Sequence, residues 1–181
     1  MNINKQSNDI MSSNLRNKKI TEYLKDIKSY QGKPEIIDSI EARIFAFTEY
    51  IVKVHREEIS DKKFFESETK LYKLLRTIDS NLCPDFEIEE DLKIIKIQKY
   101  DCDLQQELEY DLYLQNIYTI RYIFKQIVDK LYVIHSNNIF HGDLKLENIV
   151  IKGDYTLEDF GEFELRFIDF SFSGQLANKT D

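Results

Sequence analysis

The sequence has few residues that interrupt regular structure and few that could build a covalent or metal framework. Its 181 residues include five glycines, two prolines and two cysteines. Cys83 and Cys102 are too few and too far apart to indicate a disulfide framework or a cysteine-based zinc site. We therefore expect an ordinary hydrophobic core, for which the 42% content of hydrophobic residues is ample, in a reducing compartment.

Positive charge and long apolar runs are also scarce. The net charge is -8, whereas nonspecific nucleic-acid binding needs a basic face, so we expect no direct nucleic-acid partner. No apolar run approaches the ~20 residues of a membrane span. The N-terminus lacks the apolar centre of a signal peptide. These absences predict a soluble cytoplasmic protein with no membrane partner.

The hydrophobic periodicity predicts strands and helices in a definite order. Residues 1–17 are polar and are expected to form a flexible arm, followed by a helix over 20–27 that "QGKP" ends. The later elements are strands over 42–47 and 49–54, a helix over 61–78, a strand pair within 83–100, a helix over 115–136, and strands within 148–153 and 164–174. This order predicts a two-lobed α+β protein, with lobes over 18–100 and 101–181.

Two of the predicted helices carry apolar stripes that decide which side chains face inward. The stripe on 115–136 consists of Ile117, Ile120, Phe124, Ile127, Val128 and Leu131. On 61–78, Glu68 falls among the apolar residues, with Phe64 four residues before it and Leu71 three after it, whereas Glu66 falls outside them. A carboxylate that faces a core needs a cation nearby, so Glu68, unlike Glu66, is expected to have a cationic partner.

The stretch "IFHGDLKLENIVI" (139–151) gathers polar side chains between two apolar runs. Asp143 stands where a loop could present it, Asn148 follows five residues later, and Asp169 ends the apolar strand "LRFID". Phosphoryl transfer needs a base, a cation for the nucleotide phosphates and hard oxygen ligands for magnesium. These residue types fit that chemistry.

The segment "HGDLKLEN" with a downstream "DFS" resembles the catalytic loop and metal-binding motif of the protein kinase superfamily. The resemblance covers about 37–174 and implies a bilobal fold, with a small antiparallel sheet in the N-lobe and a truncated, mainly helical C-lobe. It implies that Asp143 is the catalytic base and that Lys145 contacts the γ-phosphate of ATP. The implied magnesium ligands are Asn148 and Asp169, and the implied structural residues are His141 and Phe170.

The same resemblance assigns the nucleotide site. The strand "EYIVKV" is similar to the kinase strand that carries the ATP-orienting lysine, which makes Lys53 the candidate and Glu68 its partner. The segment "KIQKYDCDL" resembles the hinge between kinase lobes. Gln98 would then be the gatekeeper, and the backbone of Lys99 and Tyr100 would help to bind adenine.

The chain departs from the usual kinase pattern at several points. No glycine precedes Lys53 in "IIDSIEARIFAFTEY", although "SIEARIF" resembles the corresponding loop of the small atypical kinase of the KEOPS complex. Gly142 replaces the usual arginine, so we expect no switching by activation-loop phosphorylation. Ser171 replaces the glycine of the metal-binding motif, and the chain stops twelve residues after Asp169.

These features together predict a minimal serine/threonine protein kinase that uses ATP and Mg²⁺. The alternatives are a KEOPS-like ATPase, a small-molecule kinase of the aminoglycoside phosphotransferase type, and a pseudokinase that acts as a regulatory binding module in a complex. Similar small kinases occur in large DNA viruses, for which the location would be the host cytoplasm. One short hairpin cannot bury Phe160, Phe163, Phe167 and Phe172 unaided, so we expect a protein partner or a homo-oligomer in addition to ATP and a protein substrate.

Overall fold

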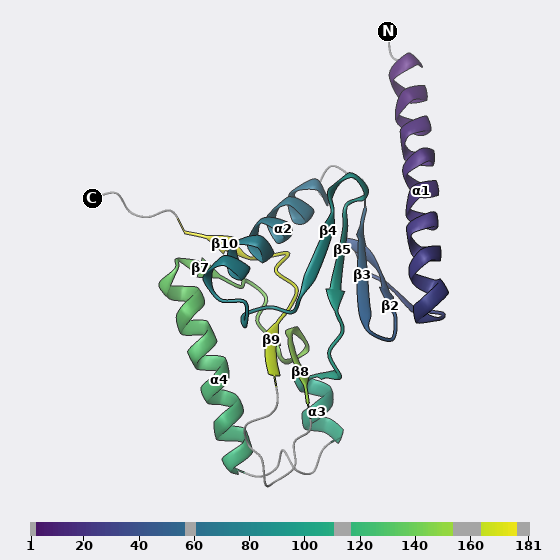
Figure 1. Cartoon of the computed structure of the whole chain (residues 1–181). Coiled ribbons are helices and arrows are strands. Elements are labelled where there is room, and N and C mark those ends of the chain that lie inside the picture. Colours follow the sequence, from purple (N-terminus) through teal and green to yellow (C-terminus); the bar gives the residue numbers. More distant parts are fainter. Residues whose placement is uncertain (1–2, 57–60, 111–116, 154–163, 177–181) are drawn as a thin grey trace, which may run out of the picture. The chain divides into compact units, whose positions relative to one another are not determined.

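The computed structural model describes residues 3–56, 61–110, 117–153 and 164–176 (Figure 1). The chain forms two compact units. The first comprises Met1–Arg56 and Glu87–Lys99, and the second comprises Glu57–Phe86 and Tyr100–Asp181. The helix expected over 61–78 therefore groups with the second unit, whereas the sequence-based division placed it in the first lobe.

The first unit is built on an antiparallel sheet with the strand order β1-β2-β3-β5-β4. The strands are β1 (Glu35–Asp38), β2 (Ala42–Ala46), β3 (Tyr50–His55), β4 (Phe86–Glu89) and β5 (Ile94–Gln98). Strands β2 and β3 form a tight hairpin in which the Phe47 amide donates to the Tyr50 carbonyl over 2.8 Å. Both strand pairs predicted from the sequence are present, and β3 and β5 pair with Lys53 opposite Ile95. A 3-10 turn, η1 (Glu90–Leu92), connects β4 to β5.

Helix α1 (Ile3–Gln31) is far longer than the helix expected over 20–27. It begins within the segment that was expected to be a flexible arm, and it ends at Gln31, directly before Gly32, which has a φ of +80°. Polar residues with helical propensity give no apolar stripe in 3–17, so the periodicity could not reveal this part of the helix. No glycine or proline interrupts the segment before Gly32.

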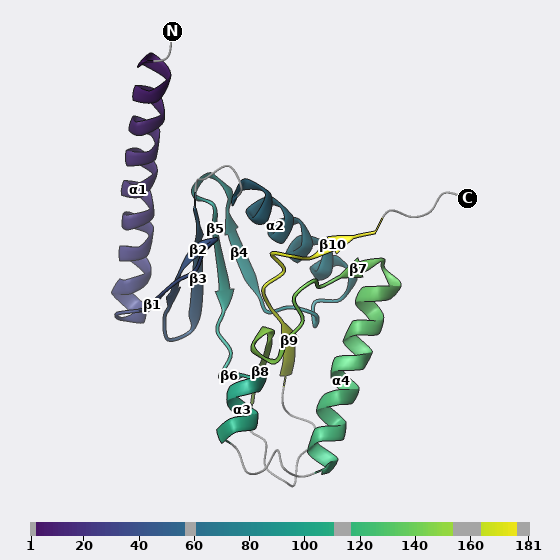
Figure 2. The ribbon, with the colours of Figure 1, turned by 180° about the vertical axis from the view of Figure 1, so that it is seen from behind.

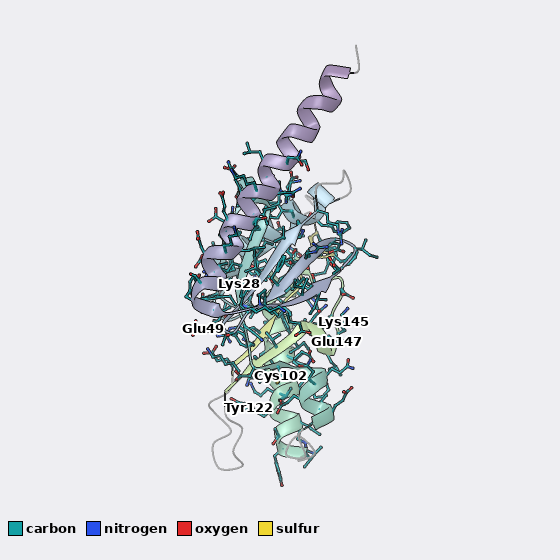
Figure 3. The ribbon with its side chains drawn as sticks, turned by 90° about the vertical axis from the view of Figure 1, so that its right-hand side faces the viewer. Lys28, Glu49, Cys102, Tyr122, Lys145 and Glu147 are labelled. Atoms are coloured by element: carbon teal, nitrogen blue, oxygen red, sulfur yellow. The ribbon has the colours of Figure 1, made fainter. Side chains whose placement is uncertain are left out.

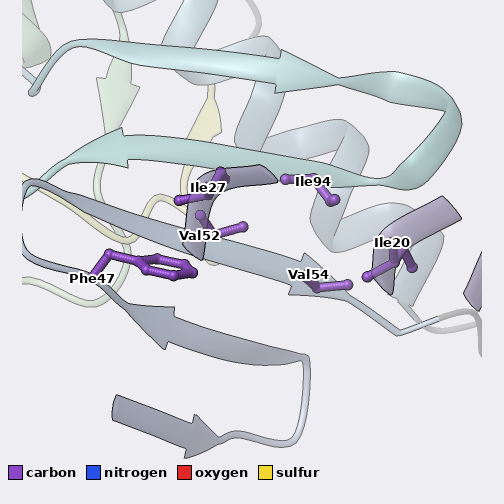
Figure 4. Packing of buried hydrophobic residues seen from close by; sticks show 6 residues of the cluster. All are labelled: Ile20, Ile27, Phe47, Val52, Val54 and Ile94. Carbon is purple, nitrogen blue, oxygen red and sulfur yellow. The ribbon is translucent and has the colours of Figure 1, made fainter. Parts of the chain in front are cut away.

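The core of the first unit lies where α1 meets the sheet (Figure 4). Its buried members are Ile20, Ile27, Phe47, Val52, Val54 and Ile94. The Arg16 guanidinium adds a polar anchor, because Nη2 donates to the carbonyl oxygens of His55 and Leu92, each over 2.8 Å. These carbonyls end β3 and precede β5, so α1 is attached to two neighbouring strands.

The second unit combines helices with two small sheets (Figure 2). Its helices are α2 (Asp61–Ile78), α3 (Leu104–Tyr110) and α4 (Ile117–Ser136). The three-stranded sheet has the order β6-β8-β9, from Cys102–Asp103, Ile149–Lys152 and Glu164–Phe167, and the two-stranded sheet pairs β7 (Ile139–Phe140) with β10 (Gly174–Gln175). The expected pairing near the C-terminus is confirmed, since β8 and β9 are antiparallel with Ile149 opposite Phe167.

The side of α4 that is buried differs from the side that the sequence predicted. The buried residues are Thr119, Ile123, Ile127 and Ile134. Phe124 and Val128, which were expected to face the core, are 61% and 58% exposed. The buried face is thus turned by roughly a quarter of the helix circumference, given 3.6 residues per turn. Apolar residues cover most of α4, so its sequence supports more than one stripe.

The exposed side of α4 continues into an apolar cavity of about 380 Å³ within the second unit. Ile120 and Phe124 of α4, Leu108 of α3, and Leu144 and Leu146 of the loop after β7 contribute to its lining. Apolar side chains of the second unit therefore remain in contact with solvent on this side.

The phenylalanines near the C-terminus have different environments. Phe167 and Phe170 are fully buried, whereas Phe172 is 53% exposed. Phe160 and Phe163 lie outside the described residues. The partner or homo-oligomer expected from these side chains stays a prediction. Within the described ranges, no helix combines the length and the apolar character required to cross a bilayer.

Candidate active site

The loop after β7 has a backbone that strongly favours glycine at one position. Gly142 has a φ of +81°, and a Cβ built there would lie 2.2 Å from the carbonyl oxygen of Phe172. A side chain would therefore be strained in its backbone and would also collide with the backbone of Phe172. The loop therefore has no room at position 142 for a side chain such as the arginine that the resemblance leads one to expect.

Asp143, Lys145 and Asn148 form one hydrogen-bonded group on this loop (Figure 3 labels Lys145). The Asn148 amide nitrogen donates to the Asp143 carbonyl oxygen over 2.8 Å and to Asp143 Oδ2 over 3.1 Å. Lys145 Nζ lies 3.1 Å from the same Oδ2. Asn148 is buried at the end of the 3-10 turn η3 (Leu146–Asn148), while the carboxylate and the ammonium are partly exposed.

This arrangement sets the orientation and charge of the Asp143 carboxylate. Both contacts of the Asn148 nitrogen are to oxygen acceptors, so the amide oxygen must point the other way, where it is a possible metal ligand. The hydrogen bond from Lys145 to Asp143 raises the pKa of the lysine, because the carboxylate stabilises its charged form. One carboxylate oxygen is thus held by two donors, and the group is accessible to solvent.

His141 and Phe170 lie in the interior beneath this loop. His141 Nε2 donates to the Ile168 carbonyl oxygen over 2.9 Å, and the ring centroid lies 4.8 Å from that of Phe170. Burial lowers the pKa of His141, so the imidazole is neutral and carries its proton on Nε2. Phe170 also contacts the Tyr72 ring edge-on at 5.1 Å. That these two residues act only structurally stays a prediction.

Asp169 follows β9 in a left-handed conformation, with a φ of +60°. The Ile168 amide donates to the Asn148 carbonyl over 3.1 Å, which places Asn148 and Asp169 at adjacent strand ends. Among the described residues, no group of three or more His, Cys, Asp or Glu side chains could hold a metal. An amide oxygen and a carboxylate nevertheless fit Mg²⁺, because this ion takes one or two protein oxygens and completes its shell with water and phosphate.

Glu68 lies on the buried side of α2, and Glu66 lies on the exposed side. The helix has the bounds that the sequence predicted, and Glu68 has no exposed surface. Close to it, burial raises the pKa of Tyr72 well above its usual value, and the charge of Glu68 adds to this shift. The side of the helix expected for Glu68 is therefore the buried one. Its pairing with Lys53 stays a prediction, since the two residues belong to different units.

The remaining predicted nucleotide-binding residues lie along β3 and after β5. Lys53 is buried on β3. Gln98 ends β5 opposite Tyr50, and the Lys99 amide donates to the Glu49 carbonyl over 2.8 Å. The Lys99 amide is therefore already bonded within the first unit, and the part of these residues in nucleotide binding stays a prediction. Tyr100 begins the second unit, where its hydroxyl donates to Glu164 and burial raises its pKa.

Sequence reasoning missed the part that Ser171 takes in the site. Its hydroxyl lies 2.8 Å from Asp169 Oδ1 and 3.3 Å from Glu68 Oε2. The sequence marks Ser171 only as a departure from the usual glycine. Its proximity to Glu68 depends on tertiary structure, because 103 positions separate the two residues.

Comparison with known proteins defines the class of this chain. The family model described as the protein kinase domain matches residues 37–181, which is most of the sequence. The chain therefore belongs to the protein kinase family, and the fold class predicted from the sequence is confirmed. Apart from Ile36, the glycine-free segment before Lys53 lies inside the matched region.

Its relatives include named serine/threonine kinases. The chain is 30% identical over 141 residues to "Serine/threonine-protein kinase PRR2" of Saccharomyces cerevisiae and 31% identical over 126 residues to "Probable serine/threonine-protein kinase fhkC" of Dictyostelium discoideum. These matches cover 72% and 70% of this chain but 19% and 16% of the relatives. A shorter match, 49% identical over 43 residues, is to "NUAK family SNF1-like kinase 2" of Rattus norvegicus; it covers 23% of this chain and 7% of that protein. The chain thus spans less than a fifth of the length of each of these relatives.

Proposed function

We propose that the chain is a minimal protein kinase that uses ATP and Mg²⁺ to phosphorylate serine or threonine residues of a protein. The observation that carries the proposal is the group formed by Asp143, Lys145 and Asn148. A carboxylate held by an amide donor and a nearby ammonium on a partly exposed loop suits a base that must meet a substrate hydroxyl.

In this proposal Asp143 receives the proton of the substrate hydroxyl as the oxygen attacks. Asn148 fixes the direction of the Asp143 carboxylate through its amide nitrogen, so the oxygen that accepts the proton is oriented before the substrate arrives. Lys145 places a positive charge beside the same carboxylate, where negative charge develops on the transferred group. A lysine at this position, together with the named relatives, favours Ser/Thr specificity.

Asn148 and Asp169 would hold Mg²⁺, which supplies charge neutralisation for the phosphates when it is bound. The support is the chemistry of the donors: one amide oxygen and one carboxylate, with room in the ion's shell for phosphate and water. Lys53 is proposed to bind the nucleotide phosphates with Glu68 as its partner. The adenine is proposed to bind at Gln98, Lys99 and Tyr100.

The test is a phosphotransfer assay with labelled ATP, Mg²⁺ and a generic Ser/Thr substrate, run beside direct nucleotide binding. Asp143→Ala should lower the rate by about 10²–10⁴-fold and change nucleotide affinity little, since a base acts mainly in the chemical step. Asp169→Ala should weaken nucleotide binding in the presence of Mg²⁺ as well.

Asp129→Ala is the matched control. Asp129 is also an aspartate paired with a lysine, Lys125, at 2.6 Å, but it is more exposed and lies on α4. Its variant should keep wild-type rates. Full activity of Asp143→Ala would show that Asp143 is not the base. A wild-type chain that binds ATP but transfers nothing would contradict the proposed activity.

A further inference from the structure

Ser171 brings one hydroxyl group between two buried or partly buried carboxylates of the second unit. We propose that Ser171 is a positioning residue, whose hydroxyl holds the Asp169 carboxylate in the orientation that receives the divalent cation and has Glu68 of α2 as its alternative acceptor. The inference rests on the proposed function in one respect, which is that Asp169 is a ligand of that cation.

The geometry gives the hydroxyl two acceptors. Ser171 is buried, and its Oγ lies 2.8 Å from Asp169 Oδ1, which is the usual length of a good hydroxyl hydrogen bond. Glu68 Oε2 lies 3.3 Å away on the other side, at the outer limit of such a bond. All three residues belong to the same unit.

A serine hydroxyl has only one proton, so it can donate fully to only one of the two carboxylates at a time. The shorter distance assigns that proton to Asp169. Rotation about the Cβ–Oγ bond redirects it to Glu68 without moving any heavy atom. The hydroxyl can therefore stay satisfied when a cation takes over part of the charge of Asp169, and Glu68 is then the acceptor.

The hydrogen bond from Ser171 also constrains the backbone of Asp169, the proposed metal ligand. Asp169 has a positive φ, which is uncommon for a residue other than glycine and needs support from its surroundings. A glycine at position 171 would supply no donor, so this chain has a constraint on Asp169 that the usual motif lacks. Partners that orient metal ligands in this way typically change metal affinity by about 10–100-fold when they are removed.

The experiment measures metal binding rather than activity. Binding of Mn²⁺, used as a spectroscopic substitute for Mg²⁺, is followed by electron paramagnetic resonance in the presence of saturating ADP. Nucleotide affinity without metal and the melting temperature are measured for the same samples. Ser171→Ala should weaken Mn²⁺ binding by about tenfold or more. Ser171→Thr, which restores the hydroxyl, should recover most of the loss.

Ser173→Ala is the matched control, since Ser173 lies two residues away and donates to the His141 carbonyl oxygen over 2.6 Å. It removes one hydroxyl hydrogen bond from the same segment but none from Asp169, so Mn²⁺ binding should stay at the wild-type level. Nucleotide affinity in the absence of metal should be equal in the wild type, Ser171→Ala, Ser171→Thr and Ser173→Ala.

The outcomes separate the inference from the proposed function. Wild-type Mn²⁺ binding in Ser171→Ala, or an equal loss in Ser173→Ala, would overturn the positioning role while leaving the kinase proposal intact. If the wild-type chain binds no Mn²⁺ with ADP, or if Asp169→Ala binds it normally, Asp169 is not a metal ligand and both proposals fail. A lower melting temperature with unchanged Mn²⁺ binding would assign Ser171 a purely structural role.

Discussion

Replacing Phe170 with leucine should destabilise the second unit much more than the same replacement at Phe172. Phe170 is fully buried and its ring contacts two other rings, with centroid distances of 4.8 Å to His141 and 5.1 Å to Tyr72. Phe172 is 53% exposed, and among the described residues its ring has one edge contact, to Phe64 at 5.6 Å. The two positions are only two residues apart, so they differ chiefly in environment.

The expected loss of stability can be worked out from these ring contacts. Each aromatic pair contributes about 0.5–1.5 kcal/mol beyond the burial of its area, so the loss of two pairs costs about 1–3 kcal/mol. Leucine retains most of the apolar surface, and the change of shape in a packed site adds about 1 kcal/mol. We expect Phe170→Leu to lower the free energy of unfolding by about 2–4 kcal/mol. Phe172→Leu removes one half-exposed ring pair, so it should lower the free energy of unfolding by only about 0.5–1 kcal/mol.

The measurement is urea unfolding followed by far-ultraviolet circular dichroism, because the chain has no tryptophan for fluorescence. The wild-type chain and both variants are compared at the same pH and protein concentration, with the slope of the transition checked for equality. Equal losses at the two positions, or a loss below about 0.5 kcal/mol for Phe170→Leu, would refute the importance of the ring contacts.

Two further predictions concern pH and regulation. Burial lowers the pKa of His141 in the folded state, whereas the unfolded chain has the ordinary pKa of about 6.5. Above about pH 6.5 the residue is neutral in both states. As pH falls below about 6.5, only the unfolded chain takes up the proton, so the free energy of unfolding decreases by up to about 1.4 kcal/mol per pH unit. In His141→Gln this pH-dependent part should disappear, so urea unfolding from pH 7.5 to 5.5 should show a shallower decline than in the wild type; parallel declines would contradict the assignment. Because Gly142 stands where kinases have an arginine and has no room for a side chain, phosphatase treatment should leave kinase activity unchanged. A large loss of activity that maps to Ser171, Ser173 or Thr180 would contradict this prediction.

The sequence predicts the elements of this chain well where the period of the apolar residues is clean. Helix α2 has the predicted bounds, and the pairing of β8 with β9 was expected. The same clean pattern places Glu68 on the buried side of α2, since a single charged residue interrupts an apolar stripe. Local periodicity is sufficient there because each element has one apolar side.

Prediction fails where the pattern is ambiguous or absent. Apolar residues surround most of α4, so only tertiary contacts decide that Ile123 rather than Phe124 is buried. The first half of α1 has no apolar period, so its helical backbone could not be distinguished from a flexible polar arm. The neighbours of Ser171 are also invisible in the sequence, because its contact to Glu68 joins segments that are distant along the chain.

Because α1 packs on the sheet, the hydrophobic core of the first unit begins earlier in the chain than the match to the kinase family does. The kinase family model begins at residue 37, yet Ile20 and Ile27 belong to the hydrophobic core of the first unit and Arg16 binds two of its carbonyls. A chain cut at the start of the family match would expose Val52, which is otherwise fully buried. The interior of the first unit therefore includes side chains of a helix that the family model does not cover, and a comparison of kinase domains by their shared region alone would omit that part of the core.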